Sequence, residues 1–384
     1  MQVTVSVGGR FHAFDMASQL QKRGALRTLI TSYPKFKAAE WGIPRSKVET
    51  ILSHEILIRA VRKLKKHDLQ FPLNLRFDRI AAERIPEDTR LLIAWSGMAL
   101  HSLDAAKRLG ATTVVERGST HIAYQDRLLR EECELTGARA DFPDPRTIDR
   151  ELQEYEKADY IGIPSSFVYK SFIDSGIAAE KLLLAPFGVD PNQFRPLQKE
   201  GSIFRVIHCG SLTIRKGIHY LLQAFHELKL KNAELWLIGA AAPETMPYLE
   251  RYRESNVILR GTFPQSELYQ QYSQGSVLCA ASIEDGLAMV VPQAMACGLP
   301  VVCTPNTGAP GLVRDAVDGF VVPIRDVGAL KEKLSYLYSR PEEALAMGIS
   351  ARQRILDGYT WNHYGDRLAD QYSRILTASS NRDV

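Results

Sequence analysis

Two adjacent acids, Glu284 and Asp285, precede a glycine and an apolar stretch in the second half of this 384-residue chain. The stretch that follows Gly286 is predicted to be a helix that starts at Leu287, because glycine and then apolar residues mark its beginning. Backbone amides at such a start, those of Leu287 and Ala288, can bind ligand phosphates. The two carboxylates beside them can accept hydrogen bonds from sugar hydroxyls.

Gln293 lies inside the same predicted helix, eight residues after Asp285. Two helical turns span about seven residues, so both side chains can face one side of a cleft. A glutamine amide can bond two neighbouring hydroxyl groups without bringing a charge.

A second candidate site is the turn Gly210-Ser211, which follows a predicted strand and precedes Arg215, Lys216 and a helix. Cations at a helix start oppose the helix dipole unless an anion binds there. Neither this turn nor the one at Gly9 is a complete dinucleotide fingerprint or a Walker loop. The pattern therefore favours a pyrophosphate held by cations and amides, with no metal motif nearby.

These residues must be positioned by strands that alternate with helical segments in both halves, the pattern of parallel sheets with crossover helices. We predict strands at 3–7, 26–31, 91–94, 113–116, 160–163, 182–185, 205–208, 235–238, 257–259, 277–280, 301–303 and 320–322. The alternation is interrupted at 186–196, a Pro- and Gly-rich stretch that we interpret as a hinge.

The fold class predicted is therefore α/β, with two Rossmann-like domains facing each other across a cleft. The N-terminal domain is expected to span residues 1–190 and to be joined by a C-terminal helix at 361–380. The donor-binding domain is expected at 191–360. Strand carboxyl ends bind ligands in such sheets, and His121 follows the strand at 113–116.

The stretch from Asp285 to Val301 resembles the signature of the retaining glycosyltransferases of family four, which have the GT-B fold. That family usually has Glu where this chain has Asp285 and Gln293, while residues 294–301, AMACGLPV, match throughout. Residues 206–217 resemble the family's strand and glycine turn, and 158–166 and 184–194 resemble further passages. Arg215 is expected to supply the charge that many members carry where this chain has Ser211.

The resemblance implies a role for each of these residues. Asp285 would meet hydroxyls of the donor sugar and Gln293 the ribose, while Arg215 and Lys216 would hold the diphosphate. His121 would lie near the transferred sugar, where it orients and polarises. The remaining expected donor contacts are Gly9, Gly210, Ser211, Phe263, Glu284, Gly286, Leu287 and Ala288, and the expected acceptor contacts are Arg10, His12 and His121.

The implied activity is transfer of a sugar from a UDP- or GDP-linked donor to an acceptor hydroxyl, with retention of anomeric configuration, in glycan or glycolipid biosynthesis. No cofactor is expected, because the nucleotide sugar is a substrate. Three alternatives remain open: another GT-B enzyme such as a sugar-nucleotide epimerase or a phosphorylase, a Rossmann oxidoreductase, and a non-catalytic protein that binds sugar nucleotides. Restoring Glu at position 293 would test whether Gln293 is a specialisation or a loss.

The composition limits the classes of site, cellular location and partner that we expect. The chain is 45% hydrophobic, and its five cysteines lack the spacing of a zinc site or a disulfide framework. We expect a cytoplasmic protein without a membrane span and with no nucleic-acid partner. The net charge of +4 hides an asymmetry, because residues 1–110 hold 19 Lys/Arg and 10 Asp/Glu, with the basic residues densest at Arg59, Arg62, Lys63, Lys65 and Lys66. Next to apolar neighbours, these cations could rest on anionic lipid at the inner membrane face, or form a solvated helix face.

Overall fold

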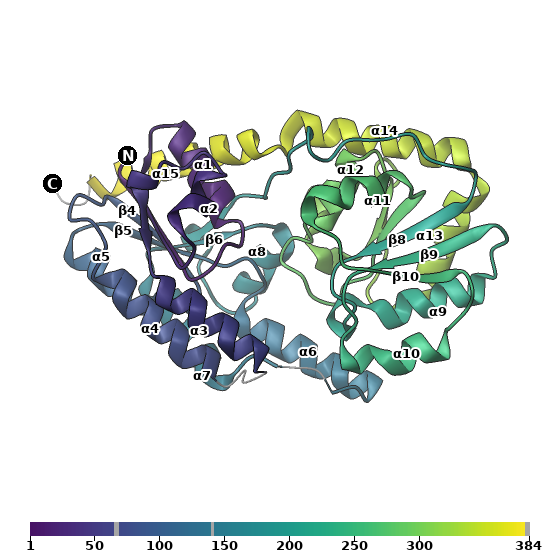
Figure 1. Ribbon diagram of the computed structural model, residues 1–384, viewed down its shortest axis with the longest axis horizontal. Coiled ribbons are helices and arrows are strands. Elements are labelled where there is room, and N and C mark those ends of the chain that lie inside the picture. Colours follow the sequence, from purple (N-terminus) through teal and green to yellow (C-terminus); the bar gives the residue numbers. More distant parts are fainter. Residues whose placement is uncertain (65–68, 140–141, 381–384) are drawn as a thin grey trace.

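The computed structural model describes residues 1–64, 69–139 and 142–380, which form two lobes around two parallel sheets (Figure 1). The first sheet has seven strands in the order β3-β2-β1-β4-β5-β6-β7, and the second has six in the order β10-β9-β8-β11-β12-β13. We call the lobe of the first sheet the N-lobe and that of the second the C-lobe. The expected doubly wound α/β architecture is confirmed.

The N-lobe sheet is buried on both faces, which explains its continuous apolar strands. All five residues of β1 (Val3–Val7), for example, are buried. Its other strands are β2 (Leu26–Thr31), β3 (Val48–Thr50), β4 (Leu91–Trp95), β5 (Thr112–Glu116), β6 (Tyr160–Ile163) and β7 (Leu182–Leu184). Its helices are α1 (Ala13–Lys22), α2 (Lys35–Ala39), α3 (Leu52–Lys63), α4 (Gln70–Ala82), α5 (Leu100–Arg108), α6 (Ile122–Thr136), α7 (Pro145–Lys157) and α8 (Ser166–Ile173).

The C-lobe has one apolar core on each face of its sheet. Its strands are β8 (Phe204–Cys209), β9 (Ala233–Ile238), β10 (Val257–Gly261), β11 (Val277–Ala280), β12 (Val301–Cys303) and β13 (Gly319–Val321). Its helices are α9 (Ile218–Leu228), α10 (Met246–Arg251), α11 (Leu268–Ser273), α12 (Val290–Ala296), α13 (Val327–Ser339) and α14 (Pro341–Gly358).

The predicted strands are all present, with ends that differ by two residues at most, and the structure adds β3. The prediction missed β3 because only one of its three residues, Val48, is fully buried and apolar. The predicted helix start at Leu287 is wrong, since α12 begins three residues later, at Val290. Leu287 instead packs into the N-lobe core, which keeps this segment out of helical conformation.

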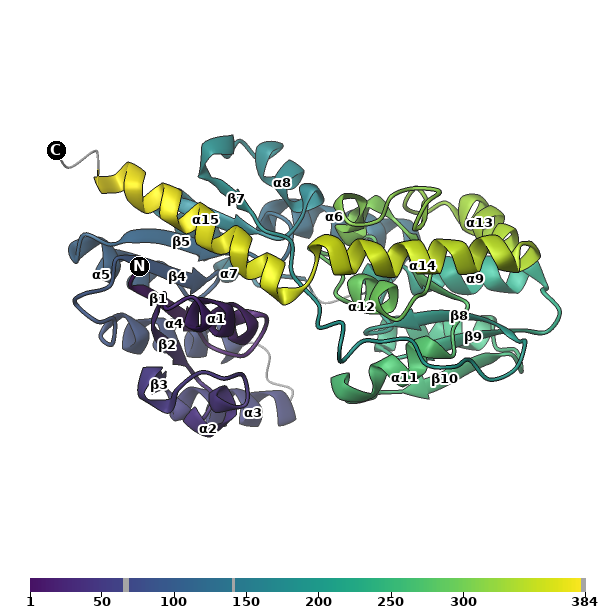
Figure 2. The ribbon, with the colours of Figure 1, turned by 90° about the horizontal axis from the view of Figure 1, so that it is seen from above.

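The chain crosses between the lobes twice, and the two crossings lie side by side. The Val189 amide donates a hydrogen bond of 2.9 Å to the Tyr359 carbonyl. Gly188 fits closely against the second crossing, because an added Cβ would lie only 2.4 Å from the Trp361 nitrogen. After this crossing, α15 (Trp361–Ser380) packs on α1 of the N-lobe, as Figure 2 shows.

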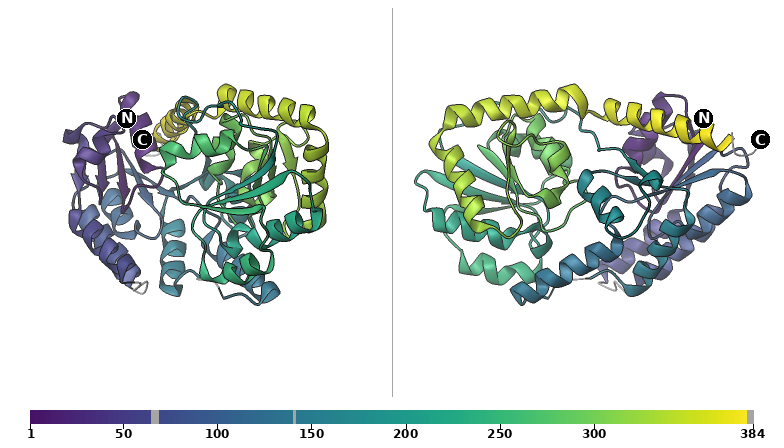
Figure 3. Two further views of the ribbon diagram at one scale, coloured as in Figure 1. Left: turned by 45° about the vertical axis from the view of Figure 1, so that its right-hand side comes forward. Right: turned by 180° about the vertical axis from the view of Figure 1, so that it is seen from behind.

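Helix α6 also links the lobes, because it runs from the N-lobe beneath the C-lobe (Figures 1 and 3). Glu132 near its end is completely buried and accepts hydrogen bonds from His219, at 2.9 Å, and from Arg325, at 2.6 Å. Both donors belong to the C-lobe. The two lobes are thus held by buried polar contacts as well as by the two crossings.

Candidate active site

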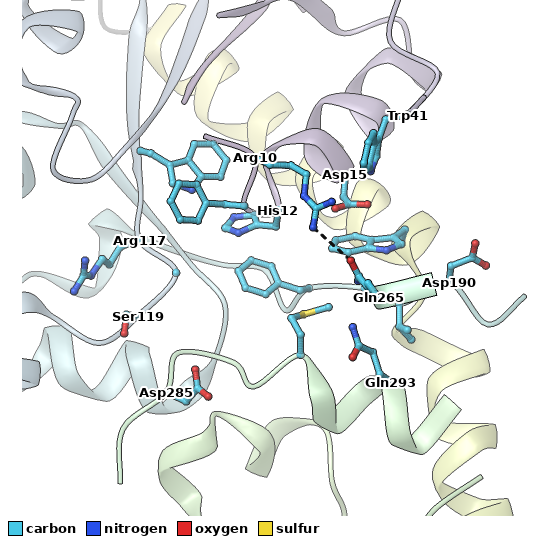
Figure 4. A pocket seen from close by; sticks show the side chains of 18 of the residues that line it. Arg10, His12, Asp15, Trp41, Arg117, Ser119, Asp190, Gln265, Asp285 and Gln293 are labelled. Atoms are coloured by element: carbon cyan, nitrogen blue, oxygen red, sulfur yellow. Dashed lines mark hydrogen bonds between the residues drawn. The ribbon is translucent and has the colours of Figure 1, made fainter. Parts of the chain in front are cut away.

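A cavity of about 620 Å³ opens between the lobes, where the carboxyl ends of both sheets meet (Figure 4). Ligands of open α/β sheets bind at such edges. The residues that line it are Arg10, Phe11, His12, Asp15, Trp41, Trp95, Ser96, Met98, Arg117, Gly118, Ser119, Phe187, Gly188, Val189, Asp190, Gln193, Phe194, Arg215, Gln265, Asp285, Met289, Gln293 and Trp361.

Asp285 and Gln293 both line the C-lobe wall of this cavity, as their spacing predicted. The Asp285 amide donates to the Asn306 carbonyl at 2.9 Å, which fixes the backbone of the acid. Gln293 lies on α12, and its side-chain carbonyl accepts a hydrogen bond of 3.2 Å from the Tyr272 hydroxyl. That bond leaves the amide nitrogen of Gln293 pointing into the cavity in Figure 4.

The cations Arg215 and Lys216 each pair with one of the two adjacent acids. Arg215 lines the cavity and donates to a Glu284 carboxylate oxygen at 3.0 Å. The Lys216 ammonium forms an ion pair with Asp285. The structure therefore places Arg215 and Asp285 on one wall of the cavity, and Lys216 lies outside the lining but pairs with Asp285.

Glu284 does not face the cavity, so the prediction that it contacts the donor sugar is wrong. Its side chain is completely buried and accepts hydrogen bonds from Ser119, at 2.7 Å, Thr120 and Gln125 of the N-lobe. Burial alone would raise the pKa of Glu284, but Arg215 and these hydrogen bonds lower it to about 2. Glu284 is thus an ionised link between the lobes.

His121 is also away from the cavity, which contradicts its predicted contact with the sugar and the acceptor. It is 4% exposed, and its ring centroid lies 5.1 Å from those of Tyr155 and Phe172. Burial, aided by Arg117, lowers the pKa of His121 to about 4. The ring is therefore neutral and packs as part of an aromatic cluster.

Arg10 and His12, the two other expected acceptor contacts, do line the cavity. The His12 ring shares a hydrogen bond of 2.9 Å with the Glu116 carboxylate and stacks near Trp95 and Phe187. Arg10 reaches across the opening and donates to the side chain of Gln265 in the C-lobe at 3.5 Å (Figure 4).

The residues that were predicted to contact the donor through their backbones lie in several different places. The Ala288 amide donates to the Thr307 carbonyl at 2.9 Å, so its predicted phosphate contact is wrong. Gly286 lies at the lobe interface, where an added Cβ would come within 1.8 Å of the Gly118 carbonyl oxygen. The cavity lining does not include six of the other residues predicted to contact the donor: Gly9, Gly210, Ser211, Phe263, Leu287 and the ion-paired Lys216. Gly210 has a φ of +129°, a backbone conformation that favours glycine.

Sequence reasoning missed the aromatic and acidic groups of the N-lobe wall. Asp15 lies on α1 one helical turn after His12, a spacing that could have indicated it. Burial raises the pKa of Asp15 to about 6, although His12, the Trp41 indole and Arg10 act in the opposite direction. Asp15 therefore titrates near neutral pH inside the cavity.

No group of three or more His, Cys, Asp or Glu side chains suited to a metal ion was found among the residues that the structure describes. In the same residues, no helix is both long and apolar enough to cross a membrane.

Residues 203–340 match the family model described as glycosyl transferases group 1. A GDP-mannose-dependent alpha-(1-6)-phosphatidylinositol monomannoside mannosyltransferase of Mycolicibacterium smegmatis is 29% identical over 243 residues, which cover 56% of this chain and 62% of that protein. The putative colanic acid biosynthesis glycosyltransferase WcaL of Salmonella typhimurium is 26% identical over 59% of each protein. The chain spans about half to three-fifths of the length of the first curated relatives it matches.

Solved structures match over nearly the whole chain. Anabaena HepE in complex with UDP and glucose superimposes with a TM-score of 0.70 at 17% identity, over 97% of this chain and 100% of that one. Sucrose-phosphate synthase from Thermosynechococcus elongatus gives 0.69 at 18% identity, over 98% and 100%. The chain therefore has the GT-B fold, and its residues 203–340 are similar to the group 1 glycosyl transferases.

Proposed function

We propose that this protein transfers a sugar from a nucleoside-diphosphate sugar to an acceptor hydroxyl, with retention of anomeric configuration, in glycan or glycolipid biosynthesis. The observation that carries the proposal is that Arg215 and Asp285 line the same wall of the cavity, while Lys216 forms an ion pair with Asp285. Positive groups beside an acid fit a diphosphate joined to a hydroxyl-rich sugar. The relatives' names include a GDP-mannose-dependent enzyme, and a solved neighbour holds UDP-glucose, so both nucleotides are candidates.

In the reaction, the bond between the anomeric carbon and the phosphate oxygen breaks, and its electron pair stays on the departing diphosphate. The acceptor oxygen forms the new bond to that carbon on the same face, and its proton passes to the departing phosphate oxygen. Arg215 and Lys216 stabilise the negative charge that builds on the diphosphate. Asp285 orients the sugar through its hydroxyls.

Gln293 binds the ribose of the donor nucleotide in this proposal. It lies on α12 in the same wall as Asp285 and is 4% exposed, so one hydrogen bond from its amide nitrogen is well shielded from water. Its lack of charge predicts weaker nucleotide binding than a carboxylate would give.

The test is incubation of the purified protein with UDP- and GDP-sugars and a panel of acceptors. Proton NMR then reads the anomeric configuration of the product. A product with the donor's configuration supports the proposal, and an inverted product contradicts retention. Conversion of the donor without any acceptor would instead indicate an epimerase, and binding without turnover across the panel a non-catalytic protein.

We also propose peripheral contact of α3 with anionic lipid. Ile56 on this helix is 67% exposed and Leu64, directly after it, is 66% exposed, and Arg59 and Lys63 are exposed beside them. Lys65 and Lys66 lie outside the described residues. Sedimentation with vesicles that contain phosphatidylglycerol should pull down the parent and leave Ile56→Glu in solution, and equal behaviour of the two would contradict the contact.

A further inference from the structure

The N-lobe wall of the cavity is aromatic. Three of the four tryptophans in the chain, Trp41, Trp95 and Trp361, line this one cavity together with Phe187. They come from three distant segments, so the clustering is a property of the fold and not of local sequence. Trp41 and Trp361 are each partly exposed, whereas Trp95 is 5% exposed.

A carboxylate stands among these rings. Asp15 and Trp41 both line the cavity, and the Arg10 guanidinium lies 5.4 Å from the centre of the Trp41 ring. Figure 4 shows Asp15, Arg10 and Trp41 on the side of the cavity opposite Asp285 and Gln293. These groups are therefore separate from the wall that holds the donor in the proposed function.

Indole rings beside a carboxylate favour a sugar ring as the ligand. The C–H face of a pyranose ring is apolar and packs on an indole, while its rim of hydroxyls donates to a carboxylate. A phosphate would be repelled by Asp15. A simple alkyl alcohol would leave most of the hydrogen-bonding capacity of this partly buried carboxylate unused.

We propose that Asp15, Trp41 and Trp361 form a subsite for a sugar ring of the acceptor, so that the acceptor is a carbohydrate. The inference rests on the proposed function but goes beyond it, because the donor wall would serve equally well with a lipid alcohol. Asp15 accepts hydrogen bonds from ring hydroxyls, and Trp41 with Trp361 contacts the apolar face of the ring.

Tryptophan fluorescence tests the subsite directly. In Trp236→Phe the remaining emission comes from the three cavity tryptophans, since Trp236 lies on β9 outside the cavity. We expect a saturable change in emission with at least one of a set of methyl pyranosides, measured with and without UDP or GDP. In the same background, Asp15→Asn and Trp41→Ala should each weaken binding by tenfold or more.

Controls separate a lost subsite from a lost fold or a failed donor assignment. Asp88→Asn, at a carboxylate exposed outside the cavity, should bind sugar like the parent. Asp15→Asn should melt at pH 7 no lower than the parent, because burial opposes the Asp15 charge. Donor binding and slow donor hydrolysis should persist in Asp15→Asn and Trp41→Ala.

The inference is overturned if no pyranoside gives a saturable response, or if Asp15→Asn binds sugar as well as Asp88→Asn does. Transfer of the donor sugar to alkyl alcohols but not to glycosides would also overturn it, while leaving the proposed function intact. Absence of all donor binding would overturn the proposed function, and the sugar titrations would still decide the subsite.

Discussion

Glu284 and Asp285 are neighbours in the chain, yet their carboxylates serve different places. Glu284 pairs with Arg215 and is buried against the N-lobe, whereas Asp285 pairs with Lys216 and faces the cavity. Two adjacent acids and two adjacent cations thus join the donor wall to the contact between the lobes. Substitution of Lys216 should therefore affect sugar transfer, whereas substitution of Glu284 should affect the contact between the lobes.

Lys216→Ala should lower the rate of sugar transfer by roughly 10²–10³-fold, because one cation that stabilises the departing diphosphate is lost. The protein should stay folded, as judged by circular dichroism, since the Lys216 side chain is not part of an apolar core. Lys170→Ala removes an exposed lysine on α8 and should transfer sugar normally. Near-normal turnover by Lys216→Ala would remove this residue from the site.

Glu284→Gln should destabilise the protein by about 1–3 kcal/mol at pH 7, because the ionised form accepts several buried hydrogen bonds. The folded-state pKa is about 2, below the ordinary value, so the stability due to ionisation is present above about pH 4.5. It is lost as the pH falls from there through about 2.

Denaturant unfolding at several pH values measures this difference. The difference in free energy of unfolding between the parent and Glu284→Gln should shrink as the pH falls below about 4.5. The exposed Glu342→Gln should match the parent throughout. A gap that is the same at pH 7 and pH 3 would show that the charge of Glu284 is not what holds the lobes.

His121→Phe should keep sugar transfer within about twofold of the parent, because the ring packs between Tyr155 and Phe172 and its backbone amide still reaches Ser171. The folded-state pKa of about 4 lies below the ordinary value, so the parent loses stability as the pH falls from about 6.5 to 4. The variant should lose less over that window, although His208, whose pKa burial also lowers to about 4, keeps its own contribution. A large fall in turnover with an unchanged melting temperature would restore His121 as a catalytic group.

Gln293→Glu should tighten binding of the donor nucleotide by about fivefold, since a hydrogen bond to a charged group is worth about 1 kcal/mol more than one to a neutral group. Gln293→Met keeps the size of the side chain and removes its polar atoms, so it should bind more weakly than the parent. Calorimetric titration with UDP and GDP provides both values. Equal affinity in all three proteins would place the ribose elsewhere.

The acceptor KM should rise as the pH falls through about 6, because protonation of Asp15 removes its ability to accept two hydroxyl hydrogen bonds. The groups that face Asp15 are Arg10, His12, the Trp41 indole and the buried Tyr364 phenol. In Asp15→Asn this step in the profile should vanish while the donor KM keeps its parent pH dependence. A profile that is unchanged in Asp15→Asn would assign the titration to another group.

The fold was predictable because buried parallel strands are continuous apolar runs, of which Val3–Val7 is the clearest. Asp285 and Gln293 share a wall as predicted, but helical spacing is not the reason, because only Gln293 lies on α12 and the Asp285 backbone is held by the Asn306 carbonyl. The direction of Glu284 was not predictable, because its partners Ser119 and Gln125 come from the other lobe. The contact predicted for His121 was wrong for the same reason, since Tyr155 and Phe172 are distant in sequence and together exclude its ring from the cavity.

The most direct test of the donor wall is a crystal structure of the protein with a UDP- or GDP-sugar. We expect diphosphate oxygens within hydrogen-bond reach of Arg215 and Lys216, the ribose at Gln293, and a sugar hydroxyl at Asp285. A nucleotide sugar bound elsewhere, or bound with both cations directed away from its phosphates, would contradict this expectation.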